Sequence, residues 1–204
     1  MPLGTIGDDG SGILLGQSVG GRTTLMANVS AWRFINPPQS FIRGILVDAK
    51  GQRICNEMLY GAQLAQKIMD KGDGKAWLLL DSSLAKQALR EIGPSQAMWF
   101  QSAAALLFLF LARRKAPTLT RLAQKLGIPD EALRDTVAQY NALHENGLND
   151  PMGKPTDYLA TLKQGPWYAL DCRVDGMVRN PSITLGGLSV DETSGEVLAV
   201  AGGK

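Results

Sequence analysis

Residues 44–56 read GILVDAKGQRICN. Two runs of β-forming residues, Ile45–Val47 and Arg53–Cys55, flank a short segment that contains a glycine, which is the pattern of a β-hairpin. A helix is expected to follow from about Glu57 to Lys71, because the apolar residues there recur at helical intervals and form one stripe. Further strands, helices and a second hairpin are expected along the chain. Because hairpins pair strands antiparallel, the predicted fold class is α+β, with a small, mostly antiparallel sheet and several helices.

The rest of the central segment supplies the other expected elements. Ala76–Leu80 is an apolar run that predicts a buried strand, and Asp81 or Ser82 is suited to cap a helix that runs to Glu91. The later elements are an almost wholly apolar helix over 97–112, a helix from Thr118, a stop at 127–129, a second helix from Asp130 to near Gly147, a strand at 167–172 and a hairpin at 189–198.

Glycine clusters lie near both ends of the chain. Glycine allows the main chain to come within contact distance of a ligand, so both clusters are candidate cofactor-binding positions. The residues concerned are Gly10, Ser11 and Gly12 near the start, and Gly186, Gly187 and Leu188 near the end. The Gly-x-Gly-x-x-Gly turn of a dinucleotide-binding fold is missing, because the nearest stretch, at 10–16, displaces the third glycine and has no apolar strand before it.

Composition and charge exclude several classes of protein. With 204 residues and 45% hydrophobic composition, the chain can bury a core as one domain with flanking arms. Its 21 basic and 19 acidic residues leave a net charge of +2, and the basic residues are scattered apart from 113–115, so no nucleic-acid partner is predicted. Cys55, Cys172 and His144 do not make a zinc-type site by themselves, and no metal is predicted.

Two further features concern location. The first residues lack the basic start and apolar core of a signal peptide, and two cysteines far apart in the sequence suit a reducing compartment, so a cytoplasmic location is expected. The apolar run at 97–112 is too short to span a membrane, since a transmembrane helix needs about 20 apolar residues. This run is interpreted as a buried or cap-edge helix, and the alternative is a surface that touches lipid or an apolar ligand.

Several short motifs, taken in order, carry a resemblance to a known family. They are GDDGSGI at 7–13, GQSVGG at 16–21, GQRICNE at 51–57, LAQKLGIP at 122–129 and TLGGL at 184–188. In order and spacing the chain resembles the FAD-dependent fumarate reductase and 3-ketosteroid dehydrogenase superfamily. The resemblance implies a cap (substrate-binding) domain at 37–175, with two terminal arms, 1–36 and 176–204, from an incomplete FAD-binding domain. It also implies FAD as the cofactor of a parent protein, held mostly by parts outside this chain.

Within this superfamily, the residues after Asn56 and Glu57 separate two chemistries. The resemblance places Gly61 where fumarate reductases carry a proton-donating arginine. It places Tyr60 where ketosteroid dehydrogenases carry a tyrosine that acts as general base. A phenol suits an apolar steroid pocket, because its desolvation costs less than that of a carboxylate. Tyr60 is therefore the candidate catalytic residue, and the expected partners are a steroid-like apolar substrate and the missing FAD domain.

Each assignment has a structural alternative. Tyr60 alternatively packs on Leu64 at the start of a helix, the first glycine cluster is a plain turn, and the second is a bulge in a strand. His144 is expected on the apolar face of its helix as a packing or capping residue, and Cys55 is expected to be an inert buried thiol. Five residues either line a steroid pocket or belong to the core: Phe34, Phe41, Met98, Trp99 and Phe100.

The activity expected for the parent protein is dehydrogenation of a 3-ketosteroid or a similar fused-ring ketone. The chain alone is expected to be inactive, because two loops hold a dinucleotide weakly. One alternative is a non-enzymatic, cap-like module that binds an apolar ligand or a partner protein through exposed apolar surface, which would also favour a homodimer. The other alternative is a fragment of a flavoprotein similar to fumarate reductase.

Overall fold

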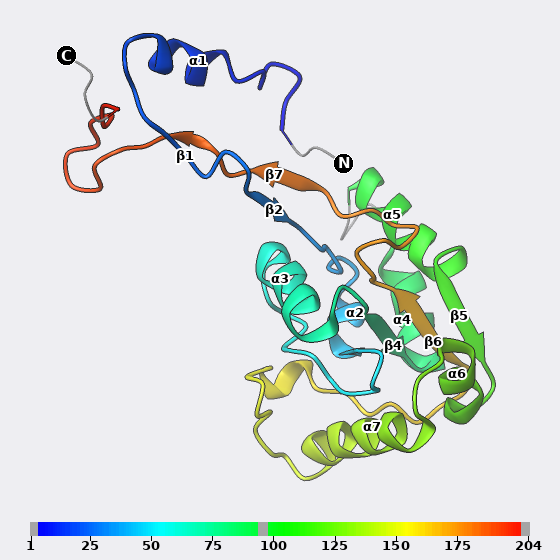
Figure 1. Cartoon of the computed structure of the whole chain (residues 1–204). Helices are drawn as coiled ribbons and strands as arrows, with labels where there is room; N and C mark the ends of the chain where they lie inside the picture. The colour runs from blue at the N-terminus through cyan, green and yellow to red at the C-terminus, as the bar shows by residue number, and fades with distance from the viewer. Residues whose placement is uncertain (1–3, 94–97, 201–204) are drawn as a thin grey trace. The chain divides into compact units, whose positions relative to one another are not determined.

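The computed structural model describes residues 4–93 and 98–200 (Figure 1). The chain divides into two compact units, one made of Met1–Ala31 with Pro181–Lys204 and the other of Trp32–Asn180. The boundaries expected from the sequence, after residues 36 and 175, fall inside the second unit. Each unit is described separately below.

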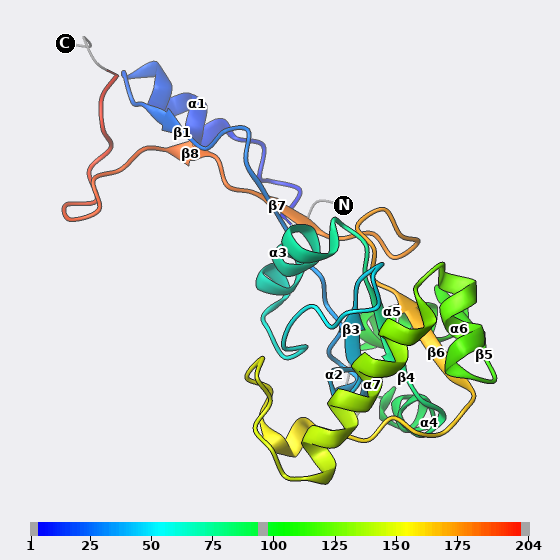
Figure 2. The ribbon, with the colours of Figure 1, turned by 60° about the horizontal axis from the view of Figure 1, so that its bottom comes forward.

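The larger unit is built on a four-stranded antiparallel sheet (Figure 2). Its strands lie in the order β3 (Ile45–Val47), β4 (Trp77–Leu80), β6 (Trp167–Asp171) and β5 (Arg113–Ala116). In one row across the sheet, Leu46 lies opposite Leu78, and Leu78 lies opposite Leu170. The helices and this small antiparallel sheet confirm the α+β class.

Strand β5 is one of several elements that the sequence did not predict, together with α2 (Gln39–Arg43) and the short strands of the smaller unit. Arg113, Arg114 and Lys115 were noted only as a basic cluster, yet Arg113–Ala116 pairs along its length with β6. Three consecutive charged residues give no apolar alternation from which to predict a strand. The place of β5 at an edge of the sheet explains its charged residues, because charged side chains on an edge strand prevent pairing with another chain.

The hairpin predicted at 44–56 is present, with a short second arm. β3 returns through a turn in which Gly51 has φ +80°, and Val47 pairs with Arg53 in a single antiparallel bridge. The Ile54 amide then donates to the Leu46 carbonyl at 2.9 Å. The hairpin therefore carries residues 53–57 back along β3.

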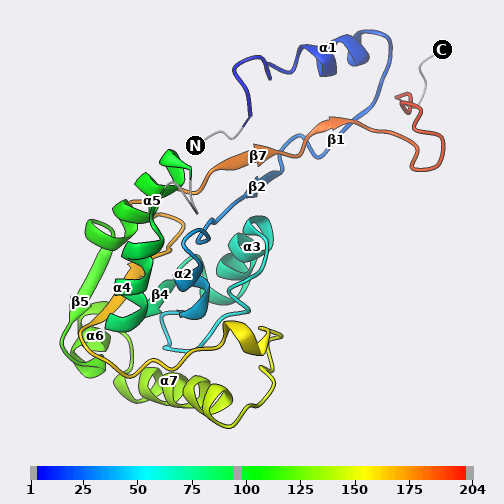
Figure 3. The same ribbon diagram turned by 180° about the vertical axis from the view of Figure 1, so that it is seen from behind.

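Helices surround this sheet, with α3 and α7 on opposite sides of it (Figures 1 and 3). The helices of the larger unit are α2 (Gln39–Arg43), α3 (Gly61–Gly72), α4 (Ser82–Glu91), α5 (Trp99–Phe110), α6 (Leu119–Leu126) and α7 (Asp130–Glu145), with a 3₁₀ turn at Thr156–Tyr158. The predicted cap of α4 is confirmed, since Asp81 Oδ1 accepts from the Leu84 amide at 2.9 Å. The helix pair at 118–145 and its stop at Gly127, with φ +68°, are also confirmed.

Two predictions about helices are wrong in detail. α3 begins at Gly61 and not at Glu57, because the Asn56 side chain accepts from the Met58 amide in a local turn and Glu57 is buried in the interior. His144 is exposed and is not part of the packed face of α7. That face consists of Leu133, Val137 and Tyr140, and it ends one turn before His144.

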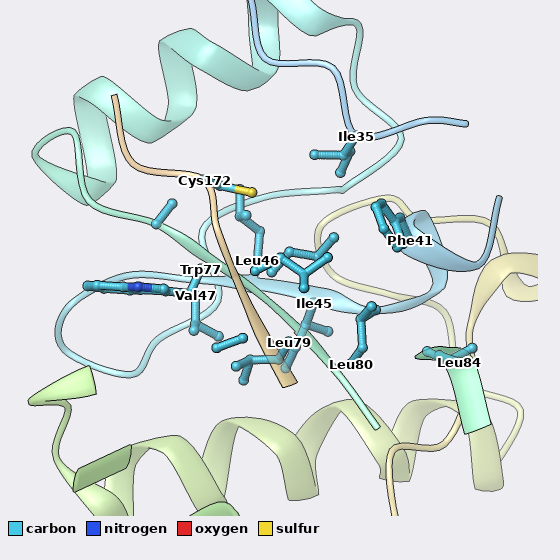
Figure 4. Packing of buried hydrophobic residues seen from close by; sticks show 14 of the residues in the cluster. Ile35, Phe41, Ile45, Leu46, Val47, Trp77, Leu79, Leu80, Leu84 and Cys172 are labelled. Atoms are coloured by element: carbon cyan, nitrogen blue, oxygen red, sulfur yellow. The ribbon is translucent and has the colours of Figure 1, made fainter. Parts of the chain in front are cut away.

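The buried apolar cluster of the described residues lies entirely in the larger unit, between Ile35 and Cys172. β3 and β4 are buried at every position, which places Ile45, Leu46 and Leu79 in the middle of the cluster (Figure 4). Cys55 and Cys172 are free and buried. Burial raises the pKa of the Cys55 thiol to about 12, with a further contribution from the negative charge of Glu57. Cys55 is thus held as the neutral thiol.

Over residues 4–31 and 181–200, the smaller unit holds one helix and two pairs of short strands. Helix α1 (Ser11–Ser18) lies along β8 (Gly187–Leu188), which pairs with β1 (Thr23–Thr24); β2 (Val29–Ala31) pairs with β7 (Ser182–Thr184) (Figure 2). A Cβ atom at Gly16 would overlap the Leu188 side chain, so Gly16 allows this close packing. The hairpin predicted at 189–198 is present as a bridge between Val190 and Val197.

Within residues 4–93 and 98–200, none of the helices combines the length and the apolar character that crossing a bilayer requires.

Candidate functional site

Tyr60 occupies the residue directly before α3, and local hydrogen bonds fix its backbone. The Tyr60 carbonyl accepts from the Leu64 amide at 2.9 Å, which is the first bond of the helix. The neighbouring Gly61 carbonyl accepts from the Arg33 amide, also at 2.9 Å. Residues 60 and 61 are therefore tied both to α3 and to the chain segment at 33.

A buried group of charges anchors the segment that leads to Tyr60. The Glu57 carboxylate accepts from the Leu46 amide at 2.9 Å and pairs with Arg53 and Lys154, each at 2.7 Å. Arg53 also pairs with Asp150 at 2.7 Å. Burial by itself would lower the pKa of Arg53. The hydrogen bonds and negative charges of Glu57 and Asp150 outweigh this effect, so the pKa of Arg53 is raised. The GQRICNE motif thus binds the hairpin to the loop at 150–154.

The Tyr60 ring lies at the rim of a hollow of about 360 Å³. It contacts Trp32 edge to face, with ring centroids 4.7 Å apart, and 62% of the Tyr60 residue is exposed. Among the described residues, no group hydrogen-bonds to its hydroxyl. The polar residues that line the same hollow are Arg33, Asn36, Glu57 and Gln101. The phenol is therefore accessible to a ligand in this hollow, so the packing alternative does not account for its hydroxyl.

An apolar hollow of about 200 Å³ adjoins the Tyr60 hollow. The two share four lining residues: Phe34, Ile35, Asn36 and Gln101. The rest of the apolar hollow is lined by Pro37, Phe41, Phe100, Ala104, Ala105 and Phe108. Three of the aromatic residues considered for a steroid pocket are thus brought together there, while Met98 and Trp99 are not among its lining residues and are exposed.

Arg33 is a residue of the Tyr60 hollow that the sequence did not predict. It is only 2% exposed, and its two terminal nitrogens donate to the carbonyls of Val178 and Arg173, each at 2.8 Å. Its Nε has no partner among the described residues, and burial lowers the pKa of the guanidinium. No local pattern predicts a buried arginine, because its two hydrogen-bond partners lie far along the chain.

Gly61 is packed closely against Phe34 and Arg33. A Cβ atom at this position would lie 3.1 Å from Phe34 Cε1 and 3.3 Å from the Arg33 carbonyl oxygen. Contacts this short require the Phe34 ring to move. An arginine at position 61 would therefore disturb the wall that separates the two hollows.

The first glycine cluster and Leu188 lie together in the smaller unit. Residues 7–13 form a hollow of about 430 Å³ with Thr184 and Leu188. Gly10 has φ +79°, and a Cβ atom at Gly10, Gly12 or Gly187 would meet nothing within 4 Å. Gly186 differs, because a Cβ atom there would lie 2.7 Å from the Met26 Cα, so packing within the unit already requires this glycine.

The chemistry of this hollow suits the uncharged parts of a flavin cofactor. Its bare main chain at Gly10 and Gly12 lets a flat ring or a ribose approach closely. Asp8 and Asp9 line the hollow as well, and the Asp9 carboxylate accepts from the Ser11 amide at 2.9 Å. Carboxylates accept hydrogen bonds from ribose hydroxyls and repel phosphates. The residues present therefore fit part of FAD but not its pyrophosphate.

Comparisons with known proteins agree with this geometry. A family model described as an FAD binding domain matches residues 18–202. The chain is 38% identical over 200 residues to a 3-oxo-5-alpha-steroid 4-dehydrogenase of Comamonas testosteroni, a match that covers 98% of this chain and 38% of that protein. It is 25% identical over 226 residues to a 3-oxosteroid 1-dehydrogenase of Mycolicibacterium smegmatis, covering 93% of this chain and 37% of that protein.

A solved structure shows the same fold. The 3-ketosteroid-Δ4-(5α)-dehydrogenase of Rhodococcus jostii, solved with 4-androstene-3,17-dione, has a TM-score of 0.73 and 28% sequence identity, covering 96% of this chain and 37% of that one. The chain thus spans less than two fifths of the length of these relatives. Because the family model matches residues 18–202 and these relatives match nearly the whole chain, the chain belongs to the FAD binding domain family, in the branch that contains the ketosteroid dehydrogenases.

Proposed function

We propose that this chain forms the substrate-facing part of a flavin-dependent dehydrogenase that oxidises a 3-ketosteroid or a similar fused-ring ketone. The observation that carries the proposal is the wall shared by the Tyr60 hollow and the apolar hollow, made by Phe34, Ile35, Asn36 and Gln101. A fused-ring substrate bound against Phe34, Phe41 and Phe100 places its ketone end beside Tyr60. In this proposal the larger unit is the cap domain.

Tyr60 removes the proton in this scheme. Dehydrogenation breaks C–H bonds on two adjacent carbons, and the hydrogen next to the ketone is the acidic one. The Tyr60 oxygen, as phenolate, forms the new O–H bond, while the electrons of the broken C–H bond form the C=C bond. FAD, if bound, would supply the acceptor for the hydride that leaves the neighbouring carbon. The absence of a hydrogen bond to the Tyr60 hydroxyl from any described residue leaves this oxygen free for the substrate.

Other residues of the two hollows position the substrate and exclude water. Phe34, Phe100 and Phe108 supply apolar surface. Arg33, a buried cation among the residues that line the Tyr60 hollow, favours the negative charge that develops there during proton transfer. The charge of Glu57, which also lines this hollow, is compensated by Arg53 and Lys154. In the smaller unit, Gly10, Ser11, Gly12, Gly187 and Leu188 contribute backbone to the flavin site, and Gly186 maintains the turn beside Met26.

Gly61 favours ketosteroid over fumarate. A fumarate reductase of the kind considered above needs a proton-donating arginine at this position. Here Gly61 packs against Phe34 Cε1 at a distance that leaves a Cβ atom only 3.1 Å from that carbon. Position 61 itself offers no guanidinium, and the side chain packed against it, Phe34, is apolar.

The test uses a chimera in which this chain replaces the matching 38% of the Comamonas testosteroni relative. We expect the chimera to oxidise a 3-ketosteroid with a dye as electron acceptor and not to reduce fumarate. Tyr60→Phe should lower turnover by about 10²- to 10⁴-fold while the flavin absorbance is retained. Tyr158→Phe is the matched control, because a phenylalanine keeps the ring contact with Arg43 and turnover should stay unchanged.

Two results would contradict the proposal. One is full ketosteroid turnover by Tyr60→Phe, which would remove the tyrosine from the chemistry. The other is a chimera that reduces fumarate and leaves ketosteroids untouched. For the 204-residue chain alone, we expect no turnover and no yellow colour after gel filtration, because the hollow at 7–13 fits only part of the cofactor.

A further inference from the structure

Helix α5 presents an apolar stripe to solvent. Trp99, Leu106 and Phe110 are exposed at intervals of seven and four residues, which places them on one side of the helix, and Phe100 and Leu111 are exposed near its two ends. Trp99 is 82% exposed, and Leu111 is 64% exposed. On its inner side the same helix buries Ala105, Phe108 and Leu109. The exposed residues therefore form one face of a helix that is apolar on both sides.

A cluster of cations lies at the end of this stripe. Strand β5 follows α5 directly, and the Arg113 guanidinium lies 5.3 Å from the centre of the Phe110 ring. Arg114 and Lys115 are exposed, and Lys125 of α6 donates to the Lys115 carbonyl at 2.7 Å. Figure 3 shows α5 leading into β5 with α6 beside it. The basic cluster, defined as Arg113, Arg114, Lys115 and Lys125, thus adjoins the apolar stripe.

The surroundings of the basic cluster contain few negative charges. The sequence carries no aspartate or glutamate between Glu91 and Asp130. Arg113, Arg114 and Lys125 line a hollow of about 280 Å³, together with Leu111 and the exposed Met177. The carboxylate in this hollow, Asp171, is paired with Arg173 at 2.8 Å. The hollow therefore offers unpaired positive charge to an anion of phosphate size.

We propose that α5 and the basic cluster form a docking surface for an anionic lipid bilayer. The helix itself carries no charged residue, but an apolar surface that holds a tryptophan and adjoins Lys and Arg side chains suits the interface of an anionic membrane. The helix of 12 residues is about 18 Å long and does not span the roughly 30 Å hydrocarbon layer. Its apolar side chains enter the headgroup region, and the cations contact lipid phosphates.

This surface adjoins the apolar hollow on the same helix. Phe100 is exposed and also lines that hollow. An apolar molecule dissolved in the bilayer would therefore reach the hollow without crossing water. That route rests on the proposed function, but binding of the bilayer itself does not.

The experiment measures sedimentation of the full chain with vesicles of phosphatidylcholine containing about a third phosphatidylglycerol, and with vesicles of phosphatidylcholine alone. Binding should be at least about tenfold stronger to the anionic vesicles and should weaken in 0.5 M salt, an ionic strength at which charges are screened over roughly 4 Å. Arg114→Glu with Lys115→Glu should reduce binding by about tenfold or more. Lys71→Glu with Lys75→Glu, an equal change of charge on exposed residues, is the matched control and should bind like the wild type.

Trp99 supplies a second, independent signal. Its fluorescence should shift to shorter wavelength on anionic vesicles, and Trp99→Phe should lose the shift but keep binding. Trp99→Gln should weaken binding, whereas Leu148→Gln, a similar change at an exposed residue of the loop after α7, should not. Circular dichroism of every variant shows whether it is folded.

Three outcomes would overturn the proposal. The first is equal sedimentation with neutral and anionic vesicles, and the second is unchanged binding by the folded charge-reversal variant. The third is a homodimer in sedimentation velocity that Trp99→Gln dissociates, with no vesicle binding, because a second copy would then be the occupant of this face. None of these outcomes depends on turnover, so they are distinguishable from failure of the proposed dehydrogenase chemistry.

Discussion

Glu57 shows how a single buried side chain anchors the segment that leads to Tyr60. Its carboxylate holds Arg53, Lys154 and the Leu46 amide at distances of 2.7 to 2.9 Å. Burial lowers the pKa of Lys154, and the charge of Glu57 offsets part of that effect. The group contains two cations, Arg53 and Lys154, and two carboxylates, Glu57 and Asp150, so its positive and negative charges are equal. Removal of either carboxylate leaves buried positive charge without compensation.

We expect Glu57→Gln to lower the free energy of unfolding by about 3–5 kcal/mol, because breaking one partner of a buried ion pair leaves the other charge desolvated. Urea unfolding followed by circular dichroism measures the change. The matched control is Glu145→Gln, which removes an exposed partner of Lys163 and should cost at most about 1 kcal/mol. Equal effects of the two substitutions would show that burial of the Glu57 group does not contribute to stability.

The buried thiols make stability depend on pH in the alkaline range. Burial raises the pKa of Cys172 to about 11 and that of Cys55 to about 12, above an ordinary value of 9.0. Below pH 9 both the folded and the unfolded chain hold these protons. Above pH 9 the unfolded chain releases them first, so the free energy of unfolding falls as the pH rises toward the folded values.

Cys55→Ala tests this dependence. Between pH 9 and 11 the wild type should lose stability faster than the variant, by about 1.4 kcal/mol per pH unit for the one thiol removed. Urea midpoints at pH 8.5 and 10.5 for both proteins provide the comparison, and the difference in slope is independent of the cavity that alanine leaves. Parallel slopes would mean that the Cys55 thiol titrates alike in the two states.

At the scale of elements, caps differ in how much they stabilise. Asp81 caps α4 through Oδ1, and its Oδ2 also accepts from the amides of Lys163 and Gln164 at 3.3 and 3.1 Å. Thr118 caps α6 with a single bond to the Arg121 amide at 3.2 Å, in an exposed position. One side chain thus joins a helix start to a distant loop, while the other acts only locally.

Asp81→Ala should therefore destabilise the chain more than Thr118→Ala. The threonine change should cost about 1 kcal/mol, as expected for loss of an N-cap. The aspartate change should cost about 2–4 kcal/mol, because it also leaves the buried amide of Leu84 and the partly buried amides of Lys163 and Gln164 without this partner. Thermal unfolding of both variants compares them directly. A cost for Asp81→Ala no larger than that for Thr118→Ala would show that the 163–164 loop does not depend on this carboxylate.

At the scale of the whole molecule, stability resides in one unit. The buried apolar cluster of the described residues runs from Ile35 to Cys172 and lies within Trp32–Asn180. The other unit, as far as the structure describes it, contributes no member to this cluster. Apolar burial is the main driving force for folding, so the larger unit should fold by itself.

We expect a protein consisting of residues 32–180 to unfold cooperatively, with a urea midpoint close to that of the full chain. Far-UV circular dichroism and urea titration test this expectation. Limited proteolysis of the full chain should release a stable fragment cut near 31 and 181, where the two units divide. An unfolded 32–180 protein would mean that the terminal segments are needed for the core.

The sequence by itself determined the elements whose causes are local. The turn at Gly51, the caps at Asp81 and Thr118, and the stop at Gly127 depend on residues a few positions apart, and all were predictable from spacing and residue type. The motifs around 7–13 and 51–57 were likewise sufficient to indicate the flavoprotein family.

Only the tertiary structure decided features that need residues from distant parts of the chain. Arg113–Ala116 became a strand because β6 offered hydrogen bonds to a segment without apolar alternation. Glu57 left the expected helix because Arg53 and Lys154 compensate its charge in the interior. The hollow that joins Phe34 to Phe100 exists because α5 packs beside the segment at 34–37. In each case the free energy comes from contacts between residues that are remote in sequence, which local patterns do not contain.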